Sequence, residues 1–417
     1  MKIKLIGTTV DYTLLQRIVE RCKNGEELEK VLADKPFLKV NYDRMGGTAA
    51  GICYMPEDYD TLANEKETKT LKRAEMTKAS GHHSTHGHVH LNLIIEDCPK
   101  IVAMFLNNEK EYTTSEKSAR YTKMNPSEEE LKLYNKWVEK LKPLIKAERP
   151  KATDKQVEKL AMENARYMIS VFTPTTFEYT TSYRQINYIY NWAKNIVEDD
   201  AFVSSYYAEV NDFYYKLRPH MESLCKELEN LGVIDPNLKD QKRDKFSFDR
   251  NDITLYQNDF NPNTYTTSYY GSFAQLAQAQ RHRSISYFID TNTLVDLACF
   301  TPDFLPEELI EEWENDMELL MYNGHYPQGM QVRIFESGTI EAFILKCKER
   351  LCSAAQYEIY LQTKRTLIEY EDALKKQKLL ENDNVKEIMK MAEINGPRCM
   401  FGYKCSNPCG NVRRGKI

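Results

Sequence analysis

The stretch SFAQLAQAQRHRSISYFID, residues 272–290, decides how the chain can be interpreted. Good helix formers lead up to Arg281, His282 and Arg283, and a β-prone run follows them. We expect a helix over 271–283 that ends with this triplet. An arginine guanidinium matches phosphate or carboxylate in planar geometry. Cations also suit an ordinary solvated helix end, and the triplet alone favours that simpler interpretation.

The composition of the chain limits the class of protein and the partners that it can have. The chain has 417 residues, 41% hydrophobic and 29% charged, which is typical of a soluble protein with two or three domains. A net charge of −5 argues against a nucleic acid polymer as partner, so anion binding would be local. No apolar run approaches the ~20 residues that span a membrane. The start, MKIKLIGTTV, resembles a first strand, and the ten scattered cysteines suggest reduced thiols in the cytoplasm.

The order of predicted elements occurs twice along the chain. Outward from the opening stretch, residues 253–260 resemble a strand, 306–324 a charged helix and 339–374 one long helix. The earlier part has a strand at its start, helices over 64–80, 127–149 and 154–168, and a helical stretch from 182 to about 230. Residues 231–252 combine Gly, Pro, Asn and charge and are the best candidate for a linker.

This order predicts a degenerate internal duplication. Arg281 stands 173 positions after Asn108, and Arg350 stands 157 positions after Ala193. The longer helical insert near 127–150 would absorb the difference. We therefore predict a first domain over 1–235, a second over 236–380, and a tail over 381–417 that contains Cys399, Cys405 and Cys409.

Short motifs are divided between the two halves. The first half contains GHHSTHGHVHLNLII from Gly81 and SEKSARY from Ser115, followed by NARYMIS with Arg166 and SYRQIN with Arg184. At the positions that correspond to the triplet it has only Asn-Glu-Lys, residues 108–110. The second half contains Gln278 with the triplet, and RLCSAAQYEIY with Arg350.

Together these motifs resemble those of the flavin-dependent thymidylate synthases. That family has a Gly-His segment before a strand, Arg-His-Arg with a glutamine three residues earlier, an acidic-x-Ser-x-Arg-Tyr motif, and an arginine before AQxEIR. The resemblance covers about residues 75–200 and 265–362. One departure is Gly87, which stands where the family has a glutamate. Family members are tetramers with active sites shared between subunits, so a duplicated chain could keep one set of motifs in each copy.

The resemblance implies an α+β fold: two tandem copies of the synthase fold, each a mainly antiparallel sheet with long helices, forming a pseudo-dimer within the chain. A homodimer would then mimic the family's tetramer. It also implies an FAD-dependent methyltransferase that converts dUMP to dTMP, with NADPH and methylenetetrahydrofolate as co-substrates. Alternatives are a related flavin-dependent enzyme that modifies pyrimidine nucleotides, and a non-catalytic protein that binds nucleotide or flavin.

The resemblance also implies roles for individual residues. Arg350 would face the uracil and stabilise negative charge on the ring. The other residues expected to bind substrate are Gln278, Glu116, Ser118, Arg120 and Arg166. The residues expected to bind FAD are His82, Arg184, Arg281, His282 and Arg283. On a continuous helix, Gln278 and His282 would share one face.

Two further clusters invite a metal hypothesis, which we do not favour. Imidazoles are common ligands, and His86, His88 and His90 would share a face if they lay on one strand. No carboxylate-rich segment accompanies them. The three cysteines of the tail lack the C-x-x-C spacing and an evident fourth ligand. We therefore predict no metal site.

Overall fold

The computed structural model describes residues 1–117, 125–200, 204–248, 257–352 and 355–381, together with 383, 386, 387 and 390. These residues form two compact units that are not consecutive in sequence. Unit 1 comprises Met1–Lys117, Thr175–Ser204 and Tyr214–Phe246, and unit 2 comprises Ser118–Pro174, Ser205–Phe213 and Ser247–Ile417. Each unit contains a four-stranded sheet.

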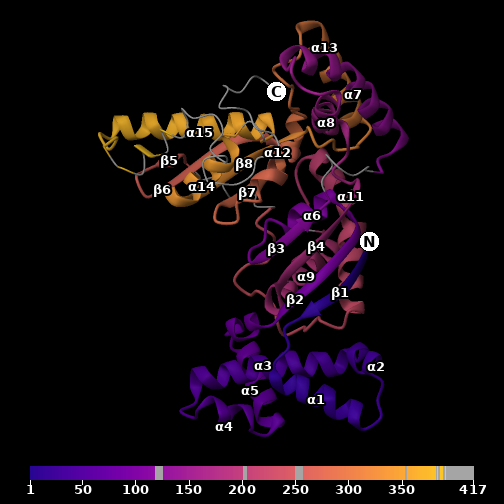
Figure 1. The fold of residues 1–417 in the computed structure, drawn as a ribbon, viewed down its shortest axis with the longest axis vertical. Helices are drawn as coiled ribbons and strands as arrows, with labels where there is room; N and C mark the ends of the chain where they lie inside the picture. The colour runs from indigo at the N-terminus through magenta and orange to yellow at the C-terminus, as the bar shows by residue number, and fades with distance from the viewer. Residues whose placement is uncertain are drawn as a thin grey trace. The chain divides into compact units, whose positions relative to one another are not determined.

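Unit 1 begins with strand β1 and a group of helices. The bounds are β1 Lys2–Thr8, α1 Tyr12–Lys23, α2 Leu28–Ala33, α3 Lys35–Tyr54, α4 Tyr59–Ala63, α5 Glu67–Ala79 and the 3-10 helix η1 His83–His88. Helices α3 and α5 lie side by side (Figure 1). Their close approach depends on Gly47, where a Cβ atom would come within 2.1 Å of the backbone oxygen of Thr70.

The sheet of unit 1 is antiparallel where its pairings are resolved and has the order β1-β2-β4-β3. The remaining elements are β2 His90–Pro99, α6 Lys100–Leu106, β3 Tyr112–Glu116, β4 Pro174–Ser182, α9 Tyr183–Glu198 and α11 Ala208–Asn230, which begins in unit 2. Leu91, Leu93 and Ile95 alternate along β2 and are buried, as expected for a strand with one face on the core. Ser182 caps α9 by accepting a hydrogen bond from the Gln185 amide.

The sheet of unit 2 has the order β5-β6-β8-β7 with antiparallel pairing. Its elements are β5 Asp259–Phe260, β6 Thr264–Ser272, α12 Phe273–Ala279, β7 Ser286–Asp290, η3 Thr291–Asp296, α13 Glu307–Tyr322, β8 Gln331–Thr339, α14 Ile340–Arg350 and α15 Tyr357–Lys376. Helices α14 and α15 pack against this sheet (Figure 1). Tyr265, Phe343 and Tyr370 form the aromatic centre of the core between them.

Helices from the first half of the sequence complete unit 2. They are α7 Glu128–Glu148, α8 Asp154–Ala165 and the 3-10 helix η2 Arg166–Met168. Trp137 of α7 packs edge-on against Trp313 of α13, with ring centroids 4.8 Å apart, and both side chains are buried. The indole N–H of Trp137 donates to Asp316 at 2.7 Å. Arg166 is thereby held in the same unit as the motifs of the second half.

The two sheets share their strand order, strand for strand. Helix α12 begins and ends 173 residues after α6, and strand β8 begins and ends 157 residues after β4. These are the two offsets predicted from the motifs. The prediction of an α+β fold with antiparallel sheets is confirmed, and the equal strand order supports the predicted duplication. The predicted domain boundary at 235 and 236 stays a prediction.

Three local expectations are wrong. Helix α12 ends at Ala279, so the Arg-His-Arg triplet lies beyond a helix and not on one. The long helix expected over 339–374 is two helices, α14 and α15. His86 and His88 lie on the 3-10 helix η1, whereas His90 begins β2, so these histidines do not share a strand face.

The segment 231–246, expected to be part of a linker, belongs to unit 1 and packs on α9. The side-chain amides of Asn187 and Asn195 donate to the carbonyls of Val233 and Asp244, and the Trp192 indole donates to that of Arg243. These bonds attach the segment to α9.

Within the described part of the chain, no helix combines the length and the apolar character needed to cross a membrane. The cysteines described there are all free thiols, and several of them are buried.

Candidate functional site

The candidate site lies in unit 2, where residues from both halves of the sequence meet. Arg166 stands directly after α8, Gln278 on the last turn of α12, Arg350 at the end of α14 and Gln356 immediately before α15. A guanidinium nitrogen of Arg166 donates to the amide oxygen of Gln356 at 2.5 Å, and the amide nitrogen of Gln278 donates to the same oxygen. Arg166 and Gln278, predicted to bind one substrate, are therefore brought together.

Arg350 joins this group through the end of α12. Its Nε–H donates to Nε2 of His282 at 2.7 Å, and one terminal nitrogen donates to the backbone carbonyl of Gln278 at 3.1 Å. His282 is buried, and it follows Gln278 in a turn. Burial, followed by the charges of Arg350 and Lys346, lowers the pKa of His282 to about 2. His282 is therefore neutral and accepts with Nε2, which places its own proton on Nδ1.

A buried carboxylate supports the other side of the site. Glu358 accepts from the Ser272 amide at 2.8 Å, from the Ser272 hydroxyl at 2.6 Å and from the Tyr167 hydroxyl at 2.8 Å. Burial raises the pKa of Glu358, although these hydrogen bonds oppose the shift. Ser272 also caps α12 by accepting from the Gln275 amide at 3.0 Å. One carboxylate thus ties the start of α12 to the segment after α8.

The arrangement can hold an anion. Nε of Arg166 is buried and has no hydrogen-bond partner among the described residues. Arg166 and Arg350 contribute fixed positive charge, since a guanidinium stays protonated in proteins. His282 is neutral, and Glu358 is already satisfied by three donors. A guanidinium with an orphaned donor, connected through Gln356 and Gln278 to a second guanidinium, suits a phosphate or another small anion.

The rest of the predicted residues are distributed as follows. Arg281 and Arg283 are exposed on either side of buried His282. Glu116 belongs to unit 1, where its carboxylate accepts from Lys100 at 2.6 and 2.8 Å. Ser118 and Arg120 lie outside the described residues. The three cysteines of the predicted tail, beyond residue 390, lie outside them as well.

His82 and Arg184 belong to unit 1 and lie at either side of η1. Nδ1 of His82 is 2.6 Å from the Tyr54 hydroxyl. Arg184, on the first turn of α9, has a buried Nε without a partner among the described residues. A Cβ atom at Gly87 would lie 3.9 Å from the guanidinium carbon of Arg184. The departure from the family's glutamate therefore occurs directly beside this arginine.

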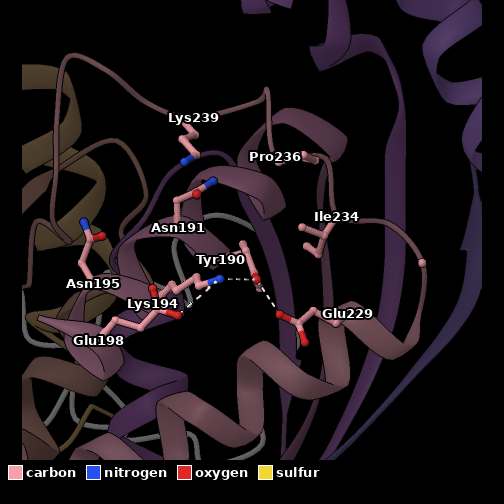
Figure 2. Close-up of a pocket in the computed structure, with 10 residues that line it drawn as sticks. Tyr190, Asn191, Lys194, Asn195, Glu198, Glu229, Ile234, Pro236 and Lys239 are labelled. Carbon is pink, nitrogen blue, oxygen red and sulfur yellow. Dashed lines mark hydrogen bonds and ion pairs between the residues drawn. The ribbon is translucent and has the colours of Figure 1, made fainter.

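Unit 1 contains a pocket of about 510 Å³, within the range of small-molecule sites. In its lining, the Tyr190 hydroxyl donates to Glu229 at 2.5 Å and lies 3.5 Å from the Lys194 ammonium (Figure 2). Burial and the bond to Glu229 raise the pKa of Tyr190, so the phenol stays protonated. The lining is formed by Tyr190, Asn191, Lys194, Asn195, Glu198, Glu229, Gly232, Ile234, Pro236 and Lys239. None of these residues was predicted from the motifs.

Within the described part of the chain, Asp43, Glu75 and Asp235 form a group of potential metal ligands whose atoms lie within 4.8 Å of one another. The Lys78 ammonium lies 2.8, 2.8 and 2.7 Å from these three carboxylates. Burial alone would lower the pKa of Lys78, but the carboxylates raise it above its usual value. The cluster is thus an ion-pair network centred on a buried lysine.

Sequence reasoning missed Gln356, Tyr167 and Glu358, which hold the site together. A signal was present, because Gln356 and Glu358 belong to the AQYEI motif and Tyr167 follows Arg166 in NARYMIS. Only the arginines of these motifs were assigned a role. The contacts that reveal the others join residues about 190 positions apart.

Solved structures with some similarity to the chain include a flavin-dependent thymidylate synthase, ThyX, from Helicobacter pylori in complex with FAD and dUMP. It has 14% sequence identity and a TM-score of 0.27 over 56% of this chain and 100% of that chain. A UMP/dUMP methylase, PolB, from Streptomyces cacaoi bound with 5-Br dUMP has 13% identity and a TM-score of 0.30 over 56% and 97%. TM-scores this low do not establish a common fold. No curated protein matches the chain.

The family comparison concerns the first half of the sequence. Residues 40–192 match the family model Thy1, described as thymidylate synthase complementing protein. The match includes the motifs with His82, Glu116, Arg166 and Arg184 and ends before Gln278. The comparison thus shows a Thy1 region, of the family described as thymidylate synthase complementing protein, over residues 40–192 of the chain.

Proposed function

We propose that the chain is a flavin-dependent thymidylate synthase that converts dUMP to dTMP, with methylenetetrahydrofolate as carbon donor and NADPH as reductant. The observation that carries this proposal is the meeting of Arg166, Gln278 and Arg350 in one compact unit. The sequence divides these residues between its halves, and the fold reunites them. The family match over residues 40–192 supports the substrate class.

Arg166 suits the phosphate of dUMP. It presents a buried, unpartnered Nε–H, and a phosphate oxygen there would satisfy the donor that the protein leaves open. Gln356 holds the other side of the guanidinium, so that its plane is fixed before the nucleotide arrives. Ser118, Arg120 and Glu116 stay proposed members of the substrate site on the strength of their motif.

Arg350 suits the uracil ring. His282 receives the Nε–H of Arg350, and the Gln278 carbonyl receives a terminal N–H, so the side chain has a fixed direction. A fixed guanidinium stabilises negative charge that develops on a substrate more effectively than a mobile one, because it needs no reorganisation. We propose that Arg350 performs this task as C5 of the uracil becomes nucleophilic.

FAD, reduced by NADPH, would supply the hydride when it is bound. The residues proposed to hold it are His82, Arg184, Arg281, His282 and Arg283. The donor set fits a cofactor with two phosphates and a polar ring edge: Arg184 has an orphaned buried Nε–H, and Arg281 and Arg283 are exposed. Buried His282 would act mainly by directing Arg350.

A homodimeric assembly and a cytoplasmic location are two further parts of the proposal, and each rests on its own observation. The repeated strand order within one chain supports a homodimer that mimics a four-subunit assembly. Light scattering that shows a monomer would contradict this. The free thiols of the described cysteines agree with a reducing cytoplasm.

Substrate-dependent oxidation of NADPH tests the proposed reaction. The purified chain should be yellow with flavin absorbance, and it should oxidise NADPH faster when both dUMP and methylenetetrahydrofolate are present. The nucleotide product should gain 14 mass units, the replacement of H by CH₃. Turnover with another pyrimidine nucleotide only would favour the related modifying enzyme. Bound nucleotide or flavin without turnover would favour a binding protein.

A further inference from the structure

Gln356 is the residue around which the site is oriented. It is buried, with 4% of its surface exposed. Its amide oxygen accepts from Arg166 and from Gln278, and its amide nitrogen donates to the Tyr167 hydroxyl. The Tyr167 hydroxyl in turn donates to Glu358 at 2.8 Å.

The direction of this chain of hydrogen bonds is fixed at both ends. A guanidinium can only donate, so the group that faces Arg166 must be the amide oxygen of Gln356. The Tyr167 proton is directed to the Glu358 carboxylate, so the phenol oxygen must accept from the amide nitrogen of Gln356. A flipped Gln356 would place its NH₂ group against a guanidinium and lose all three bonds.

The orientation of Gln356 also fixes that of Gln278. Because Gln356 offers an oxygen, Gln278 must present its NH₂ group to it. The amide oxygen of Gln278 is then left to accept, and no donor among the described residues is bonded to it. Gln278 is half-buried, so this oxygen can reach a ligand. The site thus offers donors from Arg166 and an acceptor from Gln278.

We propose that Gln356 is a positioning residue that sets the donor and acceptor pattern of the nucleotide site, and thereby directs Gln278 to a hydrogen-bond donor of the nucleotide. The proposal rests on the proposed function. A phosphate dianion has no proton to donate, so the Gln278 oxygen does not match it. The matching groups are a sugar hydroxyl and the imide N–H of a pyrimidine. The phosphate matches Arg166.

Nucleotide binding by Gln356→Met tests this proposal. Methionine keeps the volume of the side chain and removes every hydrogen bond. Gln362→Met is the matched control, because Gln362 lies on α15, the helix that Gln356 directly precedes, and is similarly buried, at 7% exposure. Titration of the holoprotein should show roughly 10- to 100-fold weaker dUMP binding for Gln356→Met, the effect of losing one or two charge-assisted bonds, and less than about 2-fold for Gln362→Met.

Nucleotide analogues separate positioning from a general disturbance. If Gln278 accepts from the sugar hydroxyl, the loss caused by Gln356→Met should be smaller for 2′,3′-dideoxy-UMP than for dUMP, and undiminished for 3-methyl-dUMP. If it accepts from the imide N–H, the pattern should reverse. Tyr167→Phe, which removes one anchor of Gln356, should show the same pattern with a smaller loss.

Four results overturn the inference. Gln356→Met that binds dUMP as the wild-type chain does would show that Gln356 orients nothing. Equal losses for dUMP and both analogues, or an equal loss in Gln362→Met, would show a general disturbance only. Absence of dUMP binding by the wild-type chain would overturn the proposed function as well, so the two failures are distinguishable.

Discussion

His282 and Arg350 determine the charge that the candidate site presents. The histidine is neutral because it is buried beside two cations, and its Nε2 accepts from the Nε–H of Arg350. A protonated His282 would lose this bond and repel the arginine. At the residue scale, therefore, His282 is buried and contacts Arg350, whereas its neighbours Arg281 and Arg283 are exposed.

Substitution of the triplet should separate these two roles. His282→Ala removes the acceptor for Arg350, and we expect dUMP affinity to fall roughly 10-fold or more, the value of a charge-assisted hydrogen bond. Arg281→Ala, at an exposed position, should reduce bound FAD while leaving dUMP affinity and the melting temperature close to wild type. Flavin absorbance and nucleotide titration measure the two effects. An unchanged dUMP affinity in His282→Ala would contradict the role given to this pair.

Two buried histidines should make the protein sensitive to acid. Burial and neighbouring cations lower the pKa of His86 to about 4 and that of His282 to about 2. Both therefore stay neutral in the folded protein at pH values where the unfolded chain, with histidine pKa near 6.5, already binds protons. The contribution of these two histidines to the free energy of unfolding is fully present above about pH 6.5. It is lost as the pH decreases, by up to about 1.4 kcal/mol per pH unit for each histidine.

Urea unfolding between pH 7.5 and pH 5 measures this dependence. His86→Gln should be less stable at pH 7.5 but should lose less stability on acidification than the wild-type chain, since one titrating group has been removed. An equal slope in both proteins would show that His86 does not contribute.

Helix boundaries show what local sequence can predict at the element scale. The helices expected over 64–80, 127–149, 154–168 and 306–324, with the strands β1 and β7, follow from propensity and periodicity. The end of α12 and the break between α14 and α15 do not follow. At both places the polar side chains and carbonyls bond to partners far along the chain: Gln278 to Arg350, and Gln356 to Arg166. Local propensity contains no information about such partners, so the site appears where local prediction fails.

The packing of α3 on α5 offers a test at this scale. A Cβ atom on Gly47 would meet the Thr70 carbonyl oxygen at 2.1 Å, and backbone cannot move aside cheaply. We expect Gly47→Ala to lower the free energy of unfolding by about 1–3 kcal/mol, despite the higher helix propensity of alanine. Thr48→Ala, at the next position and only half-buried, is the control and should change it by less than about 1 kcal/mol. A Gly47→Ala variant as stable as this control would show that the helices are not in close contact.

The two sheets have the same strand order. The offsets of 173 and 157 residues between the motifs are also the offsets between α6 and α12 and between β4 and β8. At the scale of the whole molecule, these offsets support the predicted duplication, which stays a prediction. The sequence did not predict that residues 125–174 pack into unit 2, because the contacts responsible, such as Trp137 with Trp313, depend on side chains about 176 positions apart. That packing places Arg166 beside the motifs of the second half. Among the described site residues of the first half, Arg166 is thereby joined to the motifs of the second half.

The most direct test of this account is complementation between chains that carry different defects. Arg166→Ala and Arg350→Ala should each reduce dUMP-dependent NADPH oxidation at least 10-fold, because each removes a guanidinium from the site. Coexpressed chains with distinguishable tags, purified as a mixed assembly, should be no more active than either variant alone, since both residues belong to unit 2 of one chain. Recovery of a large fraction of wild-type activity in the mixed assembly, or full activity of either single variant, would contradict a site built within one chain from both halves of its sequence.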